Sequence, residues 1–204
     1  FRAGVNAGNS IASGGNYNVV VGDEAGTAIT TGDGNVAVGF YALMTEDADG
    51  ANTAIGYQAL RDLNAGATGY NTAVGYEAGR VLTTGTVNTI VGGLAGDALT
   101  SGNSNVAVGY GALTTDTKGD RNVAIGNSTL ATQNFTTTTD SYNTAVGYEA
   151  GDAVTIGIEN TLIGGLAGNS TTDADRNVAL GYASLYTNVL GSKSTAVGYT
   201  ALHI

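Results

Sequence analysis

A nine-residue motif recurs eleven times along this 204-residue chain, and most copies lie 17 residues apart. It reads Asn-x-Ala-Val-Gly-Tyr-x-Ala-Leu/Gly, with clear copies at residues 52–60, 71–79, 105–113 and 143–151. Between the motif glycines the intervals are 17, 17, 19, 17, 17, 17, 21, 17, 17 and 17 residues. A short fixed period predicts a stack of equivalent units, none of which can bury its apolar face alone. The repeat glycines are Gly22, Gly39, Gly56, Gly75, Gly92, Gly109, Gly126, Gly147, Gly164, Gly181 and Gly198.

Positions 2 to 4 of the motif, counted from its asparagine, have the composition of a short β-strand. Position 2 is valine or threonine, position 3 is small or aliphatic, and position 4 is always aliphatic. Side chains alternate along a strand, so positions 2 and 4 share one face and position 3 takes the other. Because both faces are largely apolar, we expect both to be covered, one of them by another chain or by another wall of the coil.

Two polar or small positions frame this strand. Glycine at position 5 is present in all eleven copies, which indicates a positive-φ corner or a close backbone approach that a Cβ would block. Asparagine at position 1 occurs in ten copies, and Ser194 replaces it in the last. We expect the stacked asparagines to hydrogen-bond to backbone groups, and the Thr, Gly, Asp and Asn residues between motifs to form turns.

The predicted fold is therefore all-β: a β-solenoid or β-roll of about eleven 17-residue turns, whose second apolar face favours an oligomer. Parallel turns about 4.8 Å apart give a rod on the order of 50 Å long. Residues 1–17 are interpreted as a lead-in with one degenerate turn, and residues 18–204 as a single repeat body. The two longer intervals place insertions near residues 61–70 and 131–142. A 72-residue step also relates Gly75 to Gly147 and Gly92 to Gly164, which indicates duplication of a four-turn block.

Composition narrows the possible partners. The net charge is −10 with only seven basic residues, scattered between motifs, so nucleic acid is not an expected partner. No apolar run is long enough for a membrane span, and we expect no membrane insertion. Cysteine is absent, which removes disulfides and thiolate chemistry, and the absence of proline excludes collagen. Because the chain begins at Phe1, we interpret it as a fragment of a longer protein.

The sequence offers no catalytic set, and we predict that the protein is not an enzyme. His203 is the single histidine and lies near the end of the chain, so neither a Ser-His-Asp nor a Cys-His set can be assembled. Glu24, Glu77 and Glu149 occupy one motif position but are separated by whole turns, so solvated or capping roles are expected. No cofactor is predicted, although the acidic stretches at 46–49 and 173–175 leave calcium open as a lesser alternative.

An aromatic stripe at position 6 is the remaining candidate site. Stacked tyrosines on an exposed face offer apolar area with a polar tip, which suits glycans or proteins. The alternative, which we favour, is a structural ladder that packs against the next turn or a neighbouring chain. The stripe comprises Phe40, Tyr57, Tyr76, Tyr110, Tyr148, Tyr182 and Tyr199.

The strings NTAVGY, NVAVGY and NVAIGNS resemble the head repeats of trimeric autotransporter adhesins of the YadA-like kind. They also resemble bacteriophage tail-fibre repeats, in which NTAVGYxAL copies occur in tandem. The adhesin repeats are typically shorter, so the 17-residue unit with its position-6 tyrosine leans toward the phage kind. The resemblance covers about nine residues of each unit.

This resemblance implies a homotrimer with a structural and adhesive role in a surface fibre, either a phage tail fibre or a bacterial adhesin. The expected partners are the chain itself and a cell-surface glycan or protein receptor, and the expected location is extracellular, on a virion or a bacterial surface. The alternative is a monomeric solenoid that binds a regular surface such as ice or polysaccharide. A polysaccharide-cleaving enzyme would need a carboxylate cleft, which the sequence does not display.

Overall fold

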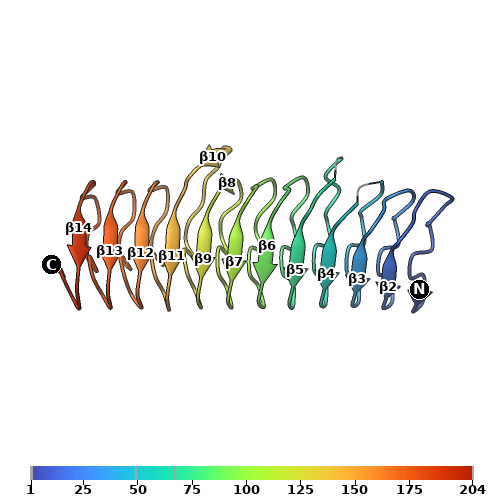
Figure 1. Ribbon diagram of the computed structural model, residues 1–204, viewed down its shortest axis with the longest axis horizontal. Coiled ribbons are helices and arrows are strands. Elements are labelled where there is room, and N and C mark those ends of the chain that lie inside the picture. The colour runs from blue at the N-terminus through green and yellow to red at the C-terminus, as the bar shows by residue number, and fades with distance from the viewer. Residues whose placement is uncertain (1, 49, 67, 204) are drawn as a thin grey trace.

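The chain forms a row of short parallel strands stacked along one long axis (Figure 1). The computed structural model describes residues 2–48, 50–66 and 68–203, and this part of the chain is all-β without a helix. Residues 1, 49, 67 and 204, which fall in the predicted lead-in, body and first insertion, lie outside the described residues. The strands are β1 (Arg2–Ala3), β2 (Val19–Val21), β3 (Val36–Val38), β4 (Thr53–Ile55), β5 (Thr72–Val74), β6 (Thr89–Val91), β7 (Val106–Val108), β8 (Gly119–Asp120), β9 (Val123–Ile125), β10 (Thr139–Asp140), β11 (Thr144–Val146), β12 (Thr161–Ile163), β13 (Val178–Leu180) and β14 (Thr195–Val197).

Twelve of these strands form one parallel sheet in the order β1-β2-β3-β4-β5-β6-β7-β9-β11-β12-β13-β14. Each repeat strand covers motif positions 2 to 4 and pairs in register with the same positions of the next turn. Val106 pairs with Val123, for example, and Val108 with Ile125. The predicted all-β solenoid with 17-residue turns is thus confirmed. The lead-in also contributes to the stack, because β1 pairs with β2.

The core is a thin column inside the coil. Position 3 points inward in every repeat strand and is buried, whereas positions 2 and 4 point outward and are half-buried or exposed. Alanine at positions 3 and 8 keeps the walls close together, and leucine at position 9 or 12 fills the remaining space. One apolar face of each strand therefore belongs to the core, and the other faces out along the whole rod.

Side-chain volume explains why position 9 alternates between leucine and glycine. Where position 3 is large, position 9 is glycine in the same turn and in the preceding one. A Cβ at Gly79 would lie 3.0 Å from Ile90 Cδ1, and a Cβ at Gly168 would lie 2.6 Å from Leu162 Cδ2. Ile90 and Leu162 thus occupy the space that a position-9 leucine fills in other turns.

The motif glycines form a corner in which successive turns touch, as expected for position 5. Their φ angles lie between 125° and 145°, a region that residues with a Cβ rarely adopt. A Cβ at Gly22 would also lie 2.6 Å from the carbonyl oxygen of Gly39 in the next turn. Gly4 has the same geometry, with φ of 129° and a Cβ position 2.5 Å from Gly22. It is therefore a twelfth corner glycine, hidden from the motif by its 18-residue interval.

Three further corners per turn place residues in the left-handed region. Positions 7, 9 and 17 have φ near +50° to +65° in turn after turn, and most of these residues are not glycine. Leu113 at position 9, with φ of 52°, is fully buried, and Val87 at position 17, with φ of 61°, is exposed. Repetition of the same strained corner shows that the coil geometry, rather than local propensity, fixes these conformations.

Buried asparagines at position 1 form the predicted ladder. The Asn105 side-chain oxygen accepts the backbone N–H of Asn122 at 2.9 Å, and Asn105 itself donates its N–H to Asn88. The Asn105 side-chain amide donates to the Gly119 carbonyl at 2.9 Å, across the corner of its own turn. Asn105 therefore satisfies backbone groups of two turns that water cannot reach.

Candidate functional site

The position-6 side chains form a line on the outside of the rod, immediately after the glycine corner; we call it the tyrosine column. Its members are Phe40, Tyr57, Tyr76, Tyr110, Tyr148, Tyr182 and Tyr199, and all are exposed. Each follows a repeat strand by two residues, so the parallel register of the sheet sets the height of each ring.

Part of the column is a stacked ladder. Phe40 and Tyr57 have ring centroids 5.5 Å apart with planes 14° from parallel, and Tyr57 and Tyr76 are 5.1 Å apart at 6°. Tyr182 and Tyr199 stack at 5.6 Å. The two sequence interpretations, a ladder and an exposed surface, hold together in these turns, because stacked rings still present their edges and hydroxyl groups to solvent.

The structure does not bring Tyr110 and Tyr148 into this ladder. Position 6 of the intervening turns is Gly93, Asn127 or Gly165, and among the described residues no ring contact involves Tyr110 or Tyr148. The column therefore consists of one three-ring stack, two separate tyrosines and one pair.

Polar side chains at position 7 lie beside the rings. Gln58 donates to the Tyr57 hydroxyl at 3.1 Å. Hydrogen bonding to Glu77 raises the pKa of the Tyr76 hydroxyl above its ordinary value, and Glu149 raises the pKa of the Tyr148 hydroxyl in the same way. The column thus combines apolar ring surface with hydrogen-bond acceptors that are held next to it.

The position-7 glutamates do not meet one another, as their spacing indicates. Glu24 accepts hydrogen bonds from Asn6 at 2.7 Å and Thr27 at 3.2 Å, and Glu77 pairs with Arg80 at 3.1 Å. They have partners of their own, and no two of them form an acid–base pair.

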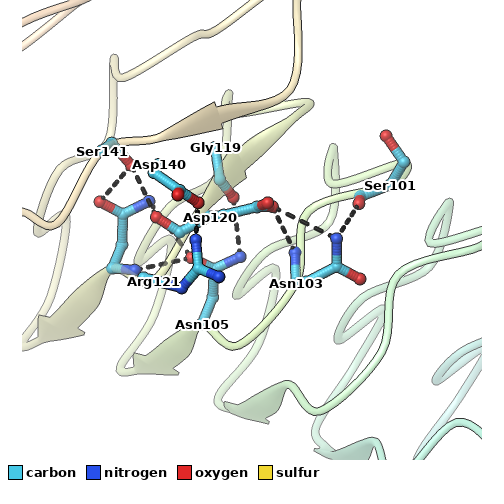
Figure 2. A network of polar contacts seen from close by, with 9 residues as sticks. Ser101, Asn103, Asn105, Gly119, Asp120, Arg121, Asp140 and Ser141 are labelled. Atoms are coloured by element: carbon cyan, nitrogen blue, oxygen red, sulfur yellow. Dashed lines mark hydrogen bonds and ion pairs between the residues drawn. The ribbon is translucent and has the colours of Figure 1, made fainter.

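A second surface feature is the longest insertion, which projects from one side of the rod at β10 and β8 (Figure 1). Thr139 and Asp140 of β10 pair in parallel with Gly119 and Asp120 of β8. Figure 2 shows the polar network beneath this pair, in which the Ser141 hydroxyl donates to the Asp120 carbonyl at 2.9 Å. Arg121 forms an ion pair with Asp140.

Sequence reasoning missed a set of polar side chains inside the coil, at the core position that is usually leucine. Glu46, Asp116, Gln133 and Thr171 are fully buried there. Asp116 accepts the backbone N–H groups of Gly119 at 3.1 Å and Phe135 at 3.2 Å, and the Gln133 amide at 2.6 Å. Burial raises the pKa of the Asp116 carboxyl above its ordinary value. This carboxylate organises the corner that carries the insertion.

Of the acidic stretch 46–49 that was considered for calcium, Glu46 lies in the core. Asp49 lies outside the described residues. Among residues 2–48, 50–66 and 68–203, no cluster of His, Cys, Asp or Glu side chains has a geometry suited to a metal ion. His203 is exposed and stacks on Tyr186 at 4.9 Å. The described residues contain no helix that is long and apolar enough to cross a membrane.

A cavity of about 230 Å³ lies at the C-terminal end of the rod. Leu185, Val189 and Leu202 line it together with Thr187, Asn188 and Ser194. None of these six described residues is titratable, and the cavity lies at the end of the core column.

Comparison of the chain with protein-family models, with curated proteins and with solved structures finds no match. The resemblance to adhesin-head and tail-fibre repeats therefore stays a prediction from the motif.

Proposed function

We propose that this chain is a structural and adhesive segment of a parallel homotrimeric surface fibre that attaches to a host or cell surface. The observation that supports this proposal is the outward face of the sheet from β2 to β14, which is uncharged and mostly apolar. This face consists of motif positions 2 and 4, and it contains valine, threonine, isoleucine and leucine only from β2 to β14. No catalytic role is proposed.

The size of this face favours a partner. Eleven strands about 4.8 Å apart, each with three residues of about 3.3 Å, give roughly 500 Å². That area is at the upper end of what a monomeric protein leaves as one exposed apolar patch. Ile125, in the middle of the face, is 38% exposed in the single chain. Covering such residues is the main gain in free energy available to an assembly.

A second copy of this chain is the partner that fits best. Chains related by a rotation axis along the rod place equal turns at equal heights, so a periodic face matches itself along its whole length. Three chains, rather than two, follow from the resemblance to trimeric adhesin heads and phage tail fibres. The rod then acts mechanically: backbone hydrogen bonds run along it, and trimer closure buries the sheet face.

Light scattering of the purified protein at micromolar concentration tests this proposal. We expect about three times the chain mass of 20.2 kDa. Ile125→Lys places a charge on the sheet face and should give the monomer mass with an unchanged far-ultraviolet circular dichroism spectrum. Thr138→Lys, on the projecting insertion, is the matched control and should keep the trimer mass. A monomeric wild-type protein would contradict the proposal.

A monomeric solenoid that binds ice or a crystalline polysaccharide is the second candidate. Its support is the in-register row of outward threonines Thr53, Thr72 and Thr89 on three adjacent strands. Valine occupies position 2 in the flanking strands β3 and β7, which limits this row to three turns. A thermal-hysteresis assay distinguishes the candidates, because the fibre proposal expects no hysteresis.

A further inference from the structure

The tyrosine column is interrupted twice by glycine in equivalent places, and each interruption leaves a gap between two tyrosine rings. Gly93 separates Tyr76 from Tyr110, and 72 residues later Gly165 separates Tyr148 from Tyr182. We refer to these as the Gly93 gap and the Gly165 gap. Each gap is one turn high, and its walls are rings from the turns before and after it.

The rings that border a gap have open faces. Ring centroids one turn apart are 5.1 to 5.6 Å from each other, so rings two turns apart stand about 10 to 11 Å apart. Tyr57, which is stacked on both sides, is 40% exposed, whereas Tyr76 is 54% and Tyr110 is 59% exposed. No ring of the described residues stacks between Tyr76 and Tyr110, and the Tyr110 ring lies beside Gly93.

Backbone geometry does not require glycine at these two positions. Neither Gly93 nor Gly165 has a positive φ. A Cβ at Gly93 would meet only the Tyr110 ring, at 3.5 Å, and a Cβ at Gly165 would meet the Tyr182 ring at 3.5 Å. Both distances are ordinary contacts, so a side chain is sterically possible and the gaps are not a by-product of the turn.

The polar surroundings of the two gaps are shared as well. Glu77 lies beside Tyr76, and Glu149 lies beside Tyr148, each close enough to raise the pKa of the neighbouring tyrosine hydroxyl. Three residues after each glutamate the two sites differ, with Arg80 at the first and Asp152 at the second. What recurs is therefore one constellation of two facing tyrosines, a glycine floor and a glutamate at the rim.

We propose that each gap binds one six-membered ring of a neutral cell-surface glycan between its two tyrosine rings. A puckered, saturated sugar ring presents C–H groups on both faces, and carbon contacts of about 3.5 to 4.0 Å on each side span about 7 to 8 Å, which fits within the separation of about 10 to 11 Å between the centroids of the two offset rings. The glutamate at the rim accepts a hydrogen bond from a sugar hydroxyl. A chain with a net charge of −10 disfavours sialylated or sulfated glycans, which selects a neutral ligand.

A tyrosine from a second copy of this chain is the competing occupant. This step rests on the proposed parallel trimer, in which equal turns lie at equal heights. A gap in one chain then faces the same gap in its neighbours, and no partner tyrosine stands at that height. The gaps consequently stay open in the fibre, with two per chain about four turns apart. A glycan that reaches both would gain from the second contact.

Isothermal titration calorimetry with neutral oligosaccharides of galactose, glucose, mannose or N-acetylglucosamine tests this proposal on the intact protein. The decisive variant is Gly93→Tyr/Gly165→Tyr, which continues the ring stack through both gaps. We expect wild-type binding and a loss of at least about tenfold in affinity in the double variant. Tyr17→Ala removes an exposed tyrosine outside the column and should bind like the wild type. A sialylated analogue should bind more weakly than its neutral parent.

Two results would overturn the proposal: no affinity of the wild type for any neutral sugar of the panel, or equal affinity in the gap-filled variant. Circular dichroism and thermal unfolding of the double variant establish that it is folded. Light scattering on the same samples keeps the two proposals separate. A wild-type monomer that binds sugar refutes the trimer proposal and supports sugar binding in the gaps. A wild-type trimer that binds no sugar supports the trimer proposal and refutes sugar binding. A gap-filled variant that dissociates would mean that a neighbouring chain occupies the gaps, and would also overturn the sugar proposal.

Discussion

Substitution of alanine for the corner glycine Gly109 should cause one of the largest losses of stability available to a single methyl group in this protein. Gly109 has φ of 132°, and a Cβ there would overlap the Gly126 carbonyl, lying 2.6 Å from its carbonyl carbon. Two matched positions separate the contributions. Gly111 has φ of 64° and open space around its Cβ position, whereas Gly198 has φ of 125° and meets only Ala201, at 4.0 Å.

The expected magnitudes follow from these environments. At Gly111, a left-handed penalty of about 1 to 2 kcal/mol is partly offset by about 0.4 to 1 kcal/mol from the less flexible unfolded chain, leaving about 1 kcal/mol. At Gly198, the backbone region is close to exclusive to glycine, and alanine should cost about 2 kcal/mol. Alanine at Gly109 must also push two turns apart. The bonds at risk are the hydrogen bonds from the Gly109 N–H to the Val91 carbonyl, at 2.8 Å, and from the Gly126 N–H to the Val108 carbonyl, at 2.7 Å. Their loss brings the total to about 4 kcal/mol or more.

Urea unfolding followed by far-ultraviolet circular dichroism measures the three variants under one condition. Because repeat arrays can unfold in sections, hydrogen exchange of the amides in β7 and β9 should accompany it. The reasoning predicts the order Gly111→Ala, Gly198→Ala, Gly109→Ala, with increasing loss. If Gly109→Ala and Gly198→Ala lose the same free energy within about 0.5 kcal/mol, turn-to-turn contact is not what requires glycine at this corner.

Three further predictions concern the corners, the buried acid and the asparagine ladder. Val87→Asn replaces a β-branched residue at φ of 61° and should raise the free energy of unfolding by about 1 kcal/mol. Ile156→Asn, at an equally exposed position without a positive φ, should not raise it. Thermal unfolding that shows no difference between the two variants would contradict this. Burial raises the pKa of the Asp116 carboxyl above 3.8, so the native state holds this proton more tightly than the unfolded chain. Stability should therefore fall as pH rises from about 3.8 through the raised native pKa, and Asp116→Asn should remove that slope in urea titrations at a series of pH values. Asn105→Ala leaves a buried backbone N–H and a buried carbonyl without partners and should cost about 3 kcal/mol by urea unfolding. Asn177→Ala should cost less, because the Asn177 side-chain amide already lacks an acceptor, and equal losses would argue against the ladder.

The repeat predicted most of the fold because each motif position has one physical task in every turn. Positions 2 to 4 became strands in all eleven copies, and the glycine and asparagine positions have the expected roles. The first turn was harder to recognise. Its corner glycine, Gly4, lies 18 residues before Gly22, and the residues Phe1, Arg2 and Ala3 before it do not match the strand positions of the motif. Only the pairing of β1 with β2 identifies it.

The alternation of leucine and glycine at position 9 was visible in the sequence, but its cause was not. Gly79 is required by Ile90, which belongs to the following turn and lies eleven residues further along the chain. A one-dimensional pattern does not state which side chains share the inside of a coil. The volume rule appears only when adjacent turns are superposed in register.

Sequence reasoning missed the acidic residues inside the coil for a related reason. Asp116 lies in a polar stretch that is typical of an exposed turn, yet its Cβ points into the coil at a position that is leucine in other turns. The carboxylate is retained there because its oxygen accepts backbone N–H groups that the corner leaves free inside. Hydropathy alone assigns such a residue to the surface, since the compensating donors come from Gly119 and from Phe135 in the next turn.

The tyrosine column separates what stability explains from what it does not. A ring at every turn would stack continuously, as Phe40, Tyr57 and Tyr76 do, and each added stacked ring stabilises the rod. Gly93 and Gly165 contribute no stacked ring, although a side chain is sterically possible at both positions and neither backbone conformation requires glycine. Both copies of the duplicated block carry the same tyrosine, glutamate and glycine arrangement. Folding supplies no reason for these two glycines, and a ligand that occupies the vacated space does.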